Sequence, residues 1–381
     1  MPKRRNQRKA PHVIYLDAVL DIPPELWEII ASSLPRKSLA ALCLVCRQFC
    51  CIISAILYRD LSNPPLNVDQ SSHLVETLSS EEALCCPAPS LLMRKLAFRQ
   101  GHSDSGSKAA IEVLRGIASH PQGSVLRALH WDSMPGLDDL GRILLDQNHL
   151  PSLKELVVKC DARHVNNFNF IQSPGLQTLE FHLEFPDLYD EYELGQKMCY
   201  KLTEALPMLP SSSPLLHTFR FRITYPYYED CFPHEAYSEF VATMNDSLLF
   251  PALSNLELAV DLRDYDYTAG FDPYGDDLPS TNFQEFLAAN PSLSELTLSV
   301  PQTKCPVDVP LPLLRLLKGT FEFAAELLAG PAHLEKLDLT FCGPVYSEFP
   351  IFRTCAFAKS PLAYPPSRPC RRPGRKTHEI G

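Results

Sequence analysis

The sequence predicts an α/β chain in which three short N-terminal helices precede an irregular solenoid of strand–loop–helix units. Two observations predict this fold class. Residues 22–60 are unusually rich in apolar side chains, and a Leu-x-x-Leu-x-apolar motif recurs between residues 93 and 339. The chain has 381 residues, 45% of them hydrophobic, which gives room for two or three folded domains.

The first of these regions divides into three helices at its proline and polar residues. Pro24 suits the first position of a helix, where a missing N–H costs nothing, and Pro35 ends that helix. Ser38 is a good N-cap for the second helix. The third helix is expected from about Arg47 to Tyr58.

These helices carry more apolar surface than so short a segment can bury. On the first helix the apolar residues span an arc of roughly 160°, whereas an ordinary surface helix needs about 100°. They are Leu26, Trp27, Ile29, Ile30 and Leu34. A segment of about 40 residues rarely folds alone. Either the rest of the chain or a second protein therefore covers the excess.

The order and spacing of these residues resemble an F-box. The matching residues are Ile22, Pro23, Glu25, Leu26, Ile29 or Ile30, Leu34, Pro35, Ser38, Leu39, Val45, Cys46, Arg47, Phe49, Leu57 and Tyr58. The departures are Ile22, where Leu is usual, and Phe49, where Trp is common. The resemblance implies docking on the Skp-type adaptor of an SCF ubiquitin ligase. It places Pro23, Leu26, Ile29, Leu34, Leu39, Val45 and Cys46 at or near that interface.

Two other interpretations of this region stay open at this stage. The run Leu39–Leu57 is long enough for a membrane helix, although Arg47 in its middle would cost about 2.5–3.5 kcal/mol on insertion. The three helices could also cap the following domain and be covered entirely by their own chain. No signal peptide is visible, because the basic start is not followed by an adequate apolar stretch.

The recurring motif predicts strands whose alternate leucines face a core, with helices between them. Its copies begin at Met93, Leu126, Leu153, Leu176, Leu216, Leu253, Leu293, Leu311 and Leu334. Helices are expected at 108–118, 137–146, 194–206, 235–244, 283–289 and 321–328. One unit cannot bury its own face, so the units stack. The pattern resembles a leucine-rich-repeat solenoid, and with the F-box it resembles a large group of fungal F-box proteins.

Three acidic, tyrosine-rich insertions interrupt the repeats at 184–193, 225–235 and 261–277. Insertions in solenoids often lie on the binding face. The sequence thus suggests that these loops hold a basic segment of a target protein. The candidate target-binding residues are Tyr227, Tyr228, Asp264, Tyr265, Asp266, Tyr267, Asp276 and Asp277. The alternatives are disordered, solvated loops with no binding role, or loops whose tyrosines pack onto the edge of the sheet.

Charge and cysteine content limit the function classes. The net charge is −10, and because both tails are basic, residues 10–352 carry about −21, which argues against nucleic acid as the main ligand. The 13 cysteines are expected to be reduced thiols, so we expect the protein in the cytoplasm, the nucleus or both.

No catalytic, metal-binding or cofactor-binding residues are expected. The segment 101–106 resembles a nucleophile elbow but lacks the second glycine, since Ser105 stands there. Cys43 and Cys46 have no second ligand pair at zinc-site spacing, and Asp264–Thr268 lacks the glycine of a calcium loop. We therefore expect a non-enzymatic subunit that joins a target protein to the adaptor and cullin of an SCF complex. The alternative is a leucine-rich-repeat scaffold outside any ligase.

The expected domain order follows from these patterns. A basic flexible tail covers 1–17, the F-box covers 18–62, and a linker covers 63–92. The repeat domain then covers 93–342, and a Pro/Arg-rich tail, expected to be disordered, covers 343–381.

Overall fold

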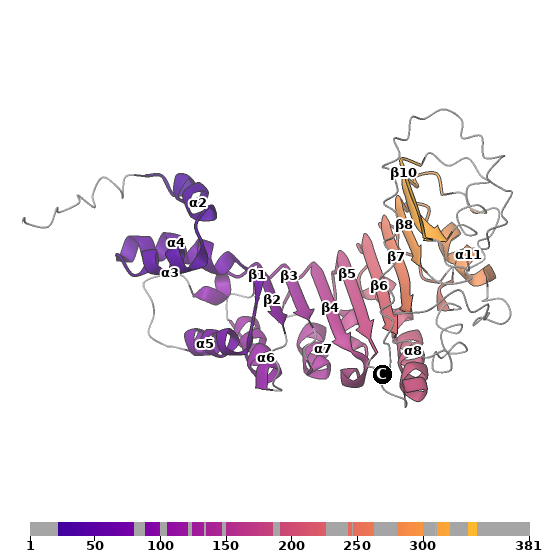
Figure 1. Ribbon diagram of the computed structural model, residues 1–381, viewed down its shortest axis with the longest axis horizontal. Helices are drawn as coiled ribbons and strands as arrows, with labels where there is room; N and C mark the ends of the chain where they lie inside the picture. Colours follow the sequence, from indigo (N-terminus) through magenta and orange to yellow (C-terminus); the bar gives the residue numbers. More distant parts are fainter. Residues whose placement is uncertain are drawn as a thin grey trace, which may run out of the picture.

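The computed structural model shows a mixed α/β chain with a helical N-terminal region and one long parallel sheet (Figure 1). It describes residues 22–79, 88–99, 105–120, 124–132, 135–146, 150–185, 191–225, 243–245, 247–262, 280–299, 309, 311–320 and 334–340. Within these residues the sheet has 10 strands, which lie side by side in sequence order from β1 to β10. Every neighbouring pair is parallel.

The helices are α2 (Pro24–Ser32), α3 (Arg36–Cys43), α4 (Arg47–Arg59), α5 (Val68–Ser79), α6 (Ser105–Ala118), α7 (Leu137–Leu145), α8 (Glu191–Ala205), α9 (Leu209–Ser212) and α11 (Ser280–Ala289). The strands are β1 (Asp60–Leu66), β2 (Lys95–Arg99), β3 (Ala128–Asp132), β4 (Glu155–Asp161), β5 (Thr178–Glu184), β6 (Thr218–Tyr225), β7 (Asn255–Leu262), β8 (Glu295–Ser299), β9 (Leu316–Thr320) and β10 (Lys336–Thr340). Four 3₁₀ turns lie between them, η1 at Pro89–Leu91, η2 at Ala162–His164, η3 at Asn169–Gln172 and η4 at Leu206–Met208.

A strand follows each of the nine predicted motif copies, so the strand prediction is confirmed for β2 to β10. The second apolar residue of each motif stands beside its counterpart in the next strand, as Leu129 stands beside Leu156. One copy was predicted in the wrong position. Because Leu317 pairs with Leu296, the eighth predicted copy, which leads into β9, begins at Leu314, three residues after Leu311. The leucine-rich run from Leu311 to Leu317 fits the motif from either Leu311 or Leu314, and only the strand pairing distinguishes the two starting points.

The sheet also begins earlier than the sequence predicts. Leu61 of β1 pairs with Leu96 of β2, and α5 follows directly after β1. The first unit therefore occupies the predicted linker, residues 63–92, and starts inside the region assigned to the F-box. Its motif was missed because Tyr58 takes the place of the first leucine.

The core lies between the sheet and the helices. Along β4, Leu156, Val158 and Cys160 are buried, whereas the alternate Val157 and Lys159 are partly exposed. The buried side chains pack with apolar residues of α6, α7, α8 and α11 in one continuous cluster. Helices α5 to α8 run along one side of the row of strands (Figure 1). The other face of the sheet is left for polar side chains.

The helix predictions have mixed outcomes. Helices α6, α7, α8 and α11 confirm four of the predicted segments, with boundaries that differ by a few residues. The predicted helix at 321–328 and nearly all of the one at 235–244 lie outside the described residues. In the described part of the chain, no helix has both the length and the hydropathy needed to cross a membrane. The run Leu39–Leu57 is divided between α3 and α4.

Buried polar side chains fasten neighbouring units to each other. The fully buried Asn290, at the end of α11, accepts a hydrogen bond from the Phe250 N–H at 2.8 Å. Its amide nitrogen donates to the carbonyls of Leu248 and Phe286 at 3.1 and 2.8 Å. Because buried amide and carbonyl groups need partners, Asn290 satisfies three backbone groups at once.

We expect Asn290→Ala to lower the free energy of unfolding by about 1–3 kcal/mol, because it leaves buried backbone groups unsatisfied. Urea unfolding followed by circular dichroism measures this loss. The control is Asn255→Ala, which removes an amide that contacts Glu295 at the surface and should change stability by less than about 0.5 kcal/mol. Equal losses in both variants would contradict the role of Asn290.

Candidate functional site

Helices α2, α3 and α4 form a small bundle with a core of its own. Helix α4 packs against both other helices. The buried side chains of this core are Trp27, Ala31, Leu39, Phe49 and Ile53. The rings of Trp27 and Phe49 meet edge to face with centroids 4.8 Å apart, an arrangement that aromatic pairs favour. The bundle thus has a defined inner side, which separates core residues from surface residues.

Five large apolar side chains of this bundle stay exposed. They are Leu26 (49% exposed), Ile29 (65%), Ile30 (40%), Leu44 (88%) and Val45 (52%), and together we call them the apolar surface. Residues three and four apart lie on one face of a helix, so Leu26, Ile29 and Ile30 share a side of α2. Leu44 and Val45 lie in the turn between α3 and α4. Exposed clusters of this kind mark interaction sites.

In the structure, the predicted adaptor-binding residues are exposed, half-buried or buried. Pro23, Leu26, Ile29 and Val45 are exposed, and Leu34 and Cys46 are half-buried. Leu39 is buried in the bundle core, so its side chain is not accessible at the surface. The sequence-based list also omitted Leu44, the most exposed of the five. The run Leu39–Val45 is apolar throughout, so the sequence alone gives no sign of which of its residues face outward.

Polar residues border the apolar surface. Glu25 and Glu28 are exposed on α2, and the hydroxyls of Ser32 and Ser33 donate to the carbonyls of Ile29 and Ile30, each at 2.7 Å. An apolar centre with a polar rim is the usual composition of a protein–protein interface. The bundle therefore has the makeup of a docking surface for another protein.

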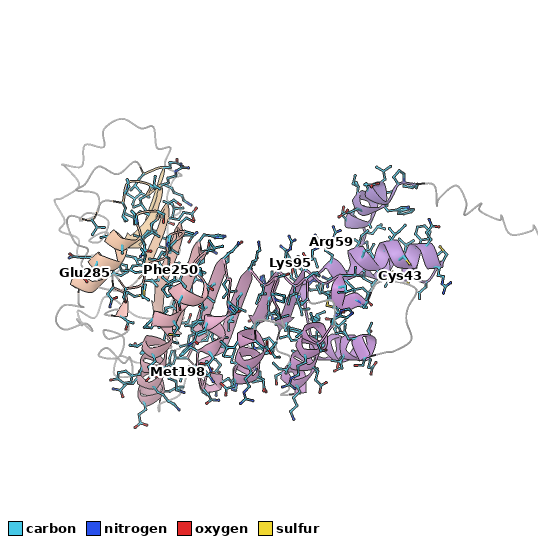
Figure 2. All side chains as sticks on the ribbon, turned by 180° about the vertical axis from the view of Figure 1, so that it is seen from behind. Cys43, Arg59, Lys95, Met198, Phe250 and Glu285 are labelled. Carbon is cyan, nitrogen blue, oxygen red and sulfur yellow. The ribbon has the colours of Figure 1, made fainter. Side chains whose placement is uncertain are left out.

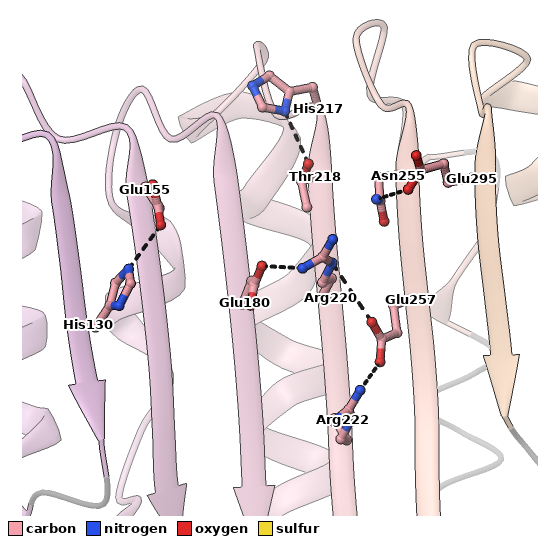
Figure 3. Close-up of polar contacts among 10 residues, drawn as sticks. All are labelled: His130, Glu155, Glu180, His217, Thr218, Arg220, Arg222, Asn255, Glu257 and Glu295. Atoms are coloured by element: carbon pink, nitrogen blue, oxygen red, sulfur yellow. Dashed lines mark hydrogen bonds and ion pairs between the residues drawn. The ribbon is translucent and has the colours of Figure 1, made fainter. Parts of the chain in front are cut away.

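The outer face of the sheet is a second candidate surface, and it is polar. Figure 3 shows a chain of cross-strand contacts on this face. His130 contacts Glu155 at 2.9 Å, and Arg220 contacts Glu180 at 2.6 Å and Glu257 at 3.8 Å. Cross-strand pairs of opposite charge stabilise a sheet by about 0.2–1 kcal/mol each. Positive and negative side chains are thus arranged in a fixed pattern across β3 to β7.

Further pairs extend this pattern. Arg222 also pairs with Glu257, so that carboxylate, which is only 16% exposed, holds two guanidinium groups (Figure 3). Lys159 contacts Glu184 at 3.1 Å on the neighbouring strand. Surface ion pairs are individually weak, at about 0–1 kcal/mol. Their effect here is to hold the side chains in defined positions.

The predicted target-binding residues lie outside the described part of the chain. They are Tyr227, Tyr228, Asp264, Tyr265, Asp266, Tyr267, Asp276 and Asp277. The prediction that the acidic insertions bind a basic segment therefore stays a prediction. The outer face of the sheet was not singled out from the sequence as a binding surface.

Among the described residues, no group of three or more His, Cys, Asp or Glu side chains could hold a metal ion. The described cysteines are free thiols. Burial raises the pKa of Cys160 well above its usual value and raises that of Cys199 to about 12, so both thiols stay protonated at neutral pH. These two thiols are therefore part of the core.

A comparison with protein families finds a match for the segment that forms the bundle. Residues 19–64 match the family model described as F-box-like. No curated protein matches the chain. The chain thus carries an F-box-like domain, and domains of that family bind Skp-type adaptors in SCF complexes.

We expect Leu44→Asp to change the free energy of unfolding by less than about 0.5 kcal/mol, because that side chain is already in water. Phe49→Ala should lower it by about 3–5 kcal/mol, because it opens a cavity beside Trp27. Urea unfolding of the two variants measures the contrast. A large loss in Leu44→Asp would show that the turn is part of the core.

Proposed function

We propose that this chain is the substrate-recognition subunit of an SCF-type ubiquitin ligase and has no catalytic activity of its own. The apolar surface carries the proposal. It lies on the segment that matches the F-box-like model, and its own chain leaves it open to solvent. Covering a large apolar side chain gains about 1.5–3 kcal/mol, so a Skp-type adaptor that buries several of the five gains a substantial affinity.

The proposal also assigns a role to the sheet domain. We interpret it as a leucine-rich-repeat-like solenoid whose outer face and insertions bind the target protein. The in-register leucine ladder and the strict strand order support this interpretation. Ubiquitin transfer would be carried out by other subunits held through a cullin. A fungal-type member of this group and a cytoplasmic or nuclear location stay expectations from the sequence.

The proposal can be tested by affinity purification with the proteasome inhibited. The wild type should recover both the Skp-type adaptor and the cullin. Ile29→Asp/Leu44→Asp should reduce adaptor recovery at least about 100-fold, because two charges enter an apolar contact worth roughly 1.5–3 kcal/mol per side chain.

The matched control is Leu215→Asp, which places a charge at a leucine of similar exposure in the sheet domain. It should recover the adaptor as the wild type does. Recovery of adaptor without cullin would favour the alternative, a scaffold outside any ligase. Failure of the wild type to recover the adaptor would refute the proposal.

A further inference from the structure

The helical bundle and the sheet meet without a linker. Helix α4 ends at Arg59, and β1 begins at Asp60. The Arg94 N–H donates to the Arg59 carbonyl at 2.9 Å, and the Arg127 N–H donates to the Arg94 carbonyl at 2.8 Å. The backbone ladder of the sheet thus starts on the last residue of the F-box-like bundle. Figure 2 shows Arg59 and Lys95 close together at this junction.

A side chain from the bundle also closes the free edge of the sheet. The guanidinium of Arg36, at the start of α3, donates to the Asp60 carbonyl at 2.6 Å and to the Pro64 carbonyl at 3.3 Å. Carbonyls alternate along a strand, so Asp60 directs its carbonyl away from β2 when Arg59 directs its own toward it. Arg36 therefore satisfies acceptors that a bare edge strand would expose.

The sequence of β1 suits an edge that is covered in this way. Pro64 and Pro65 have no N–H to offer, and proline in a sheet is confined to edge strands and similar positions. Desolvation opposes ionisation of Asp60, but hydrogen bonds from Ser62 and the nearby charges of Lys95 and Arg36 outweigh it and lower the pKa of Asp60. The carboxylate of Asp60 therefore remains charged at the junction between the bundle and the sheet.

Tyr58 lies in the last turn of α4, at the junction. It packs against the main core of the sheet domain. Burial there is the largest cause that raises the pKa of Tyr58. At the other side of α4, Arg59 pairs with Glu28 of α2. Backbone hydrogen bonds, the Arg36 guanidinium and the packing of Tyr58 therefore cross one short junction.

We infer that the F-box-like bundle is the N-terminal cap of the sheet, that the two unfold as one cooperative unit, and that Arg36 is the positioning residue that couples them. Stacked repeats need a cap where the first unit has no neighbour. The apolar surface and the outer sheet face then keep one fixed orientation. This inference does not depend on which partner covers the apolar surface.

The two tryptophans of the chain make the coupling measurable, because Trp27 lies in the bundle and Trp131 in the sheet core. In full-length chain carrying Trp131→Phe, fluorescence during urea unfolding reports the bundle alone. The buried Leu96 of β2 is then changed to alanine. With coupling, Leu96→Ala lowers the urea midpoint read at Trp27 by about 1 M, although the substitution is in the sheet.

Adding Arg36→Ala should remove at least half of that shift, which a double-mutant cycle measures. Lys37→Ala is the matched control, since it removes the same charge from the next residue of α3 and should leave the shift intact. If Leu96→Ala prevents folding, Leu96→Val replaces it and a smaller shift is expected. The inference is overturned if the sheet substitution leaves the Trp27 midpoint unchanged, or if Arg36→Ala and Lys37→Ala behave alike.

Discussion

The whole structure depends on one constraint, which is that a single strand–helix unit cannot bury its own apolar face. Each unit places a leucine or a phenylalanine beside the same position of the next, as with Leu179 and Phe219. The backbone of each inner strand of the described sheet pairs in parallel with both neighbours. Stability is therefore shared between adjacent units, and the ends of the row are its weak points.

At the first end, the constraint explains why the F-box-like bundle and the parallel sheet share residues. Tyr58 is the last aromatic of the F-box pattern and also occupies the first motif position of β1. The bundle can then use its inner residues, such as Phe49, for folding and leave Ile29 and Leu44 open. A bundle without the sheet behind it would have a second exposed side to cover.

Much of this could be predicted from the sequence, because motif and spacing are local signals. The three helices and nine strands follow from proline positions and from the leucine period. The first strand was missed because a tyrosine replaces its leucine, and the ninth was misplaced because Leu311 and Leu314 both fit the motif. The distinction between buried Leu39 and exposed Leu44 also could not be predicted, since it depends on how α3 and the turn after it meet α4.

As the proposed target-binding surface, the outer face of the sheet would favour selectivity over affinity. Its charged groups already pair with each other, as Glu257 does with Arg220 and Arg222, so a target gains little from one more opposite charge. A wrong partner instead has to break these pairs and leave a charge of the half-buried Glu257 unmatched, which costs more than the contact returns. A target that fits must therefore offer both charges in an order that matches Glu180, Arg220 and Glu257. Under the proposed capping, the first end would hold this face in one direction, so a bound target would lie at a fixed distance from the apolar surface.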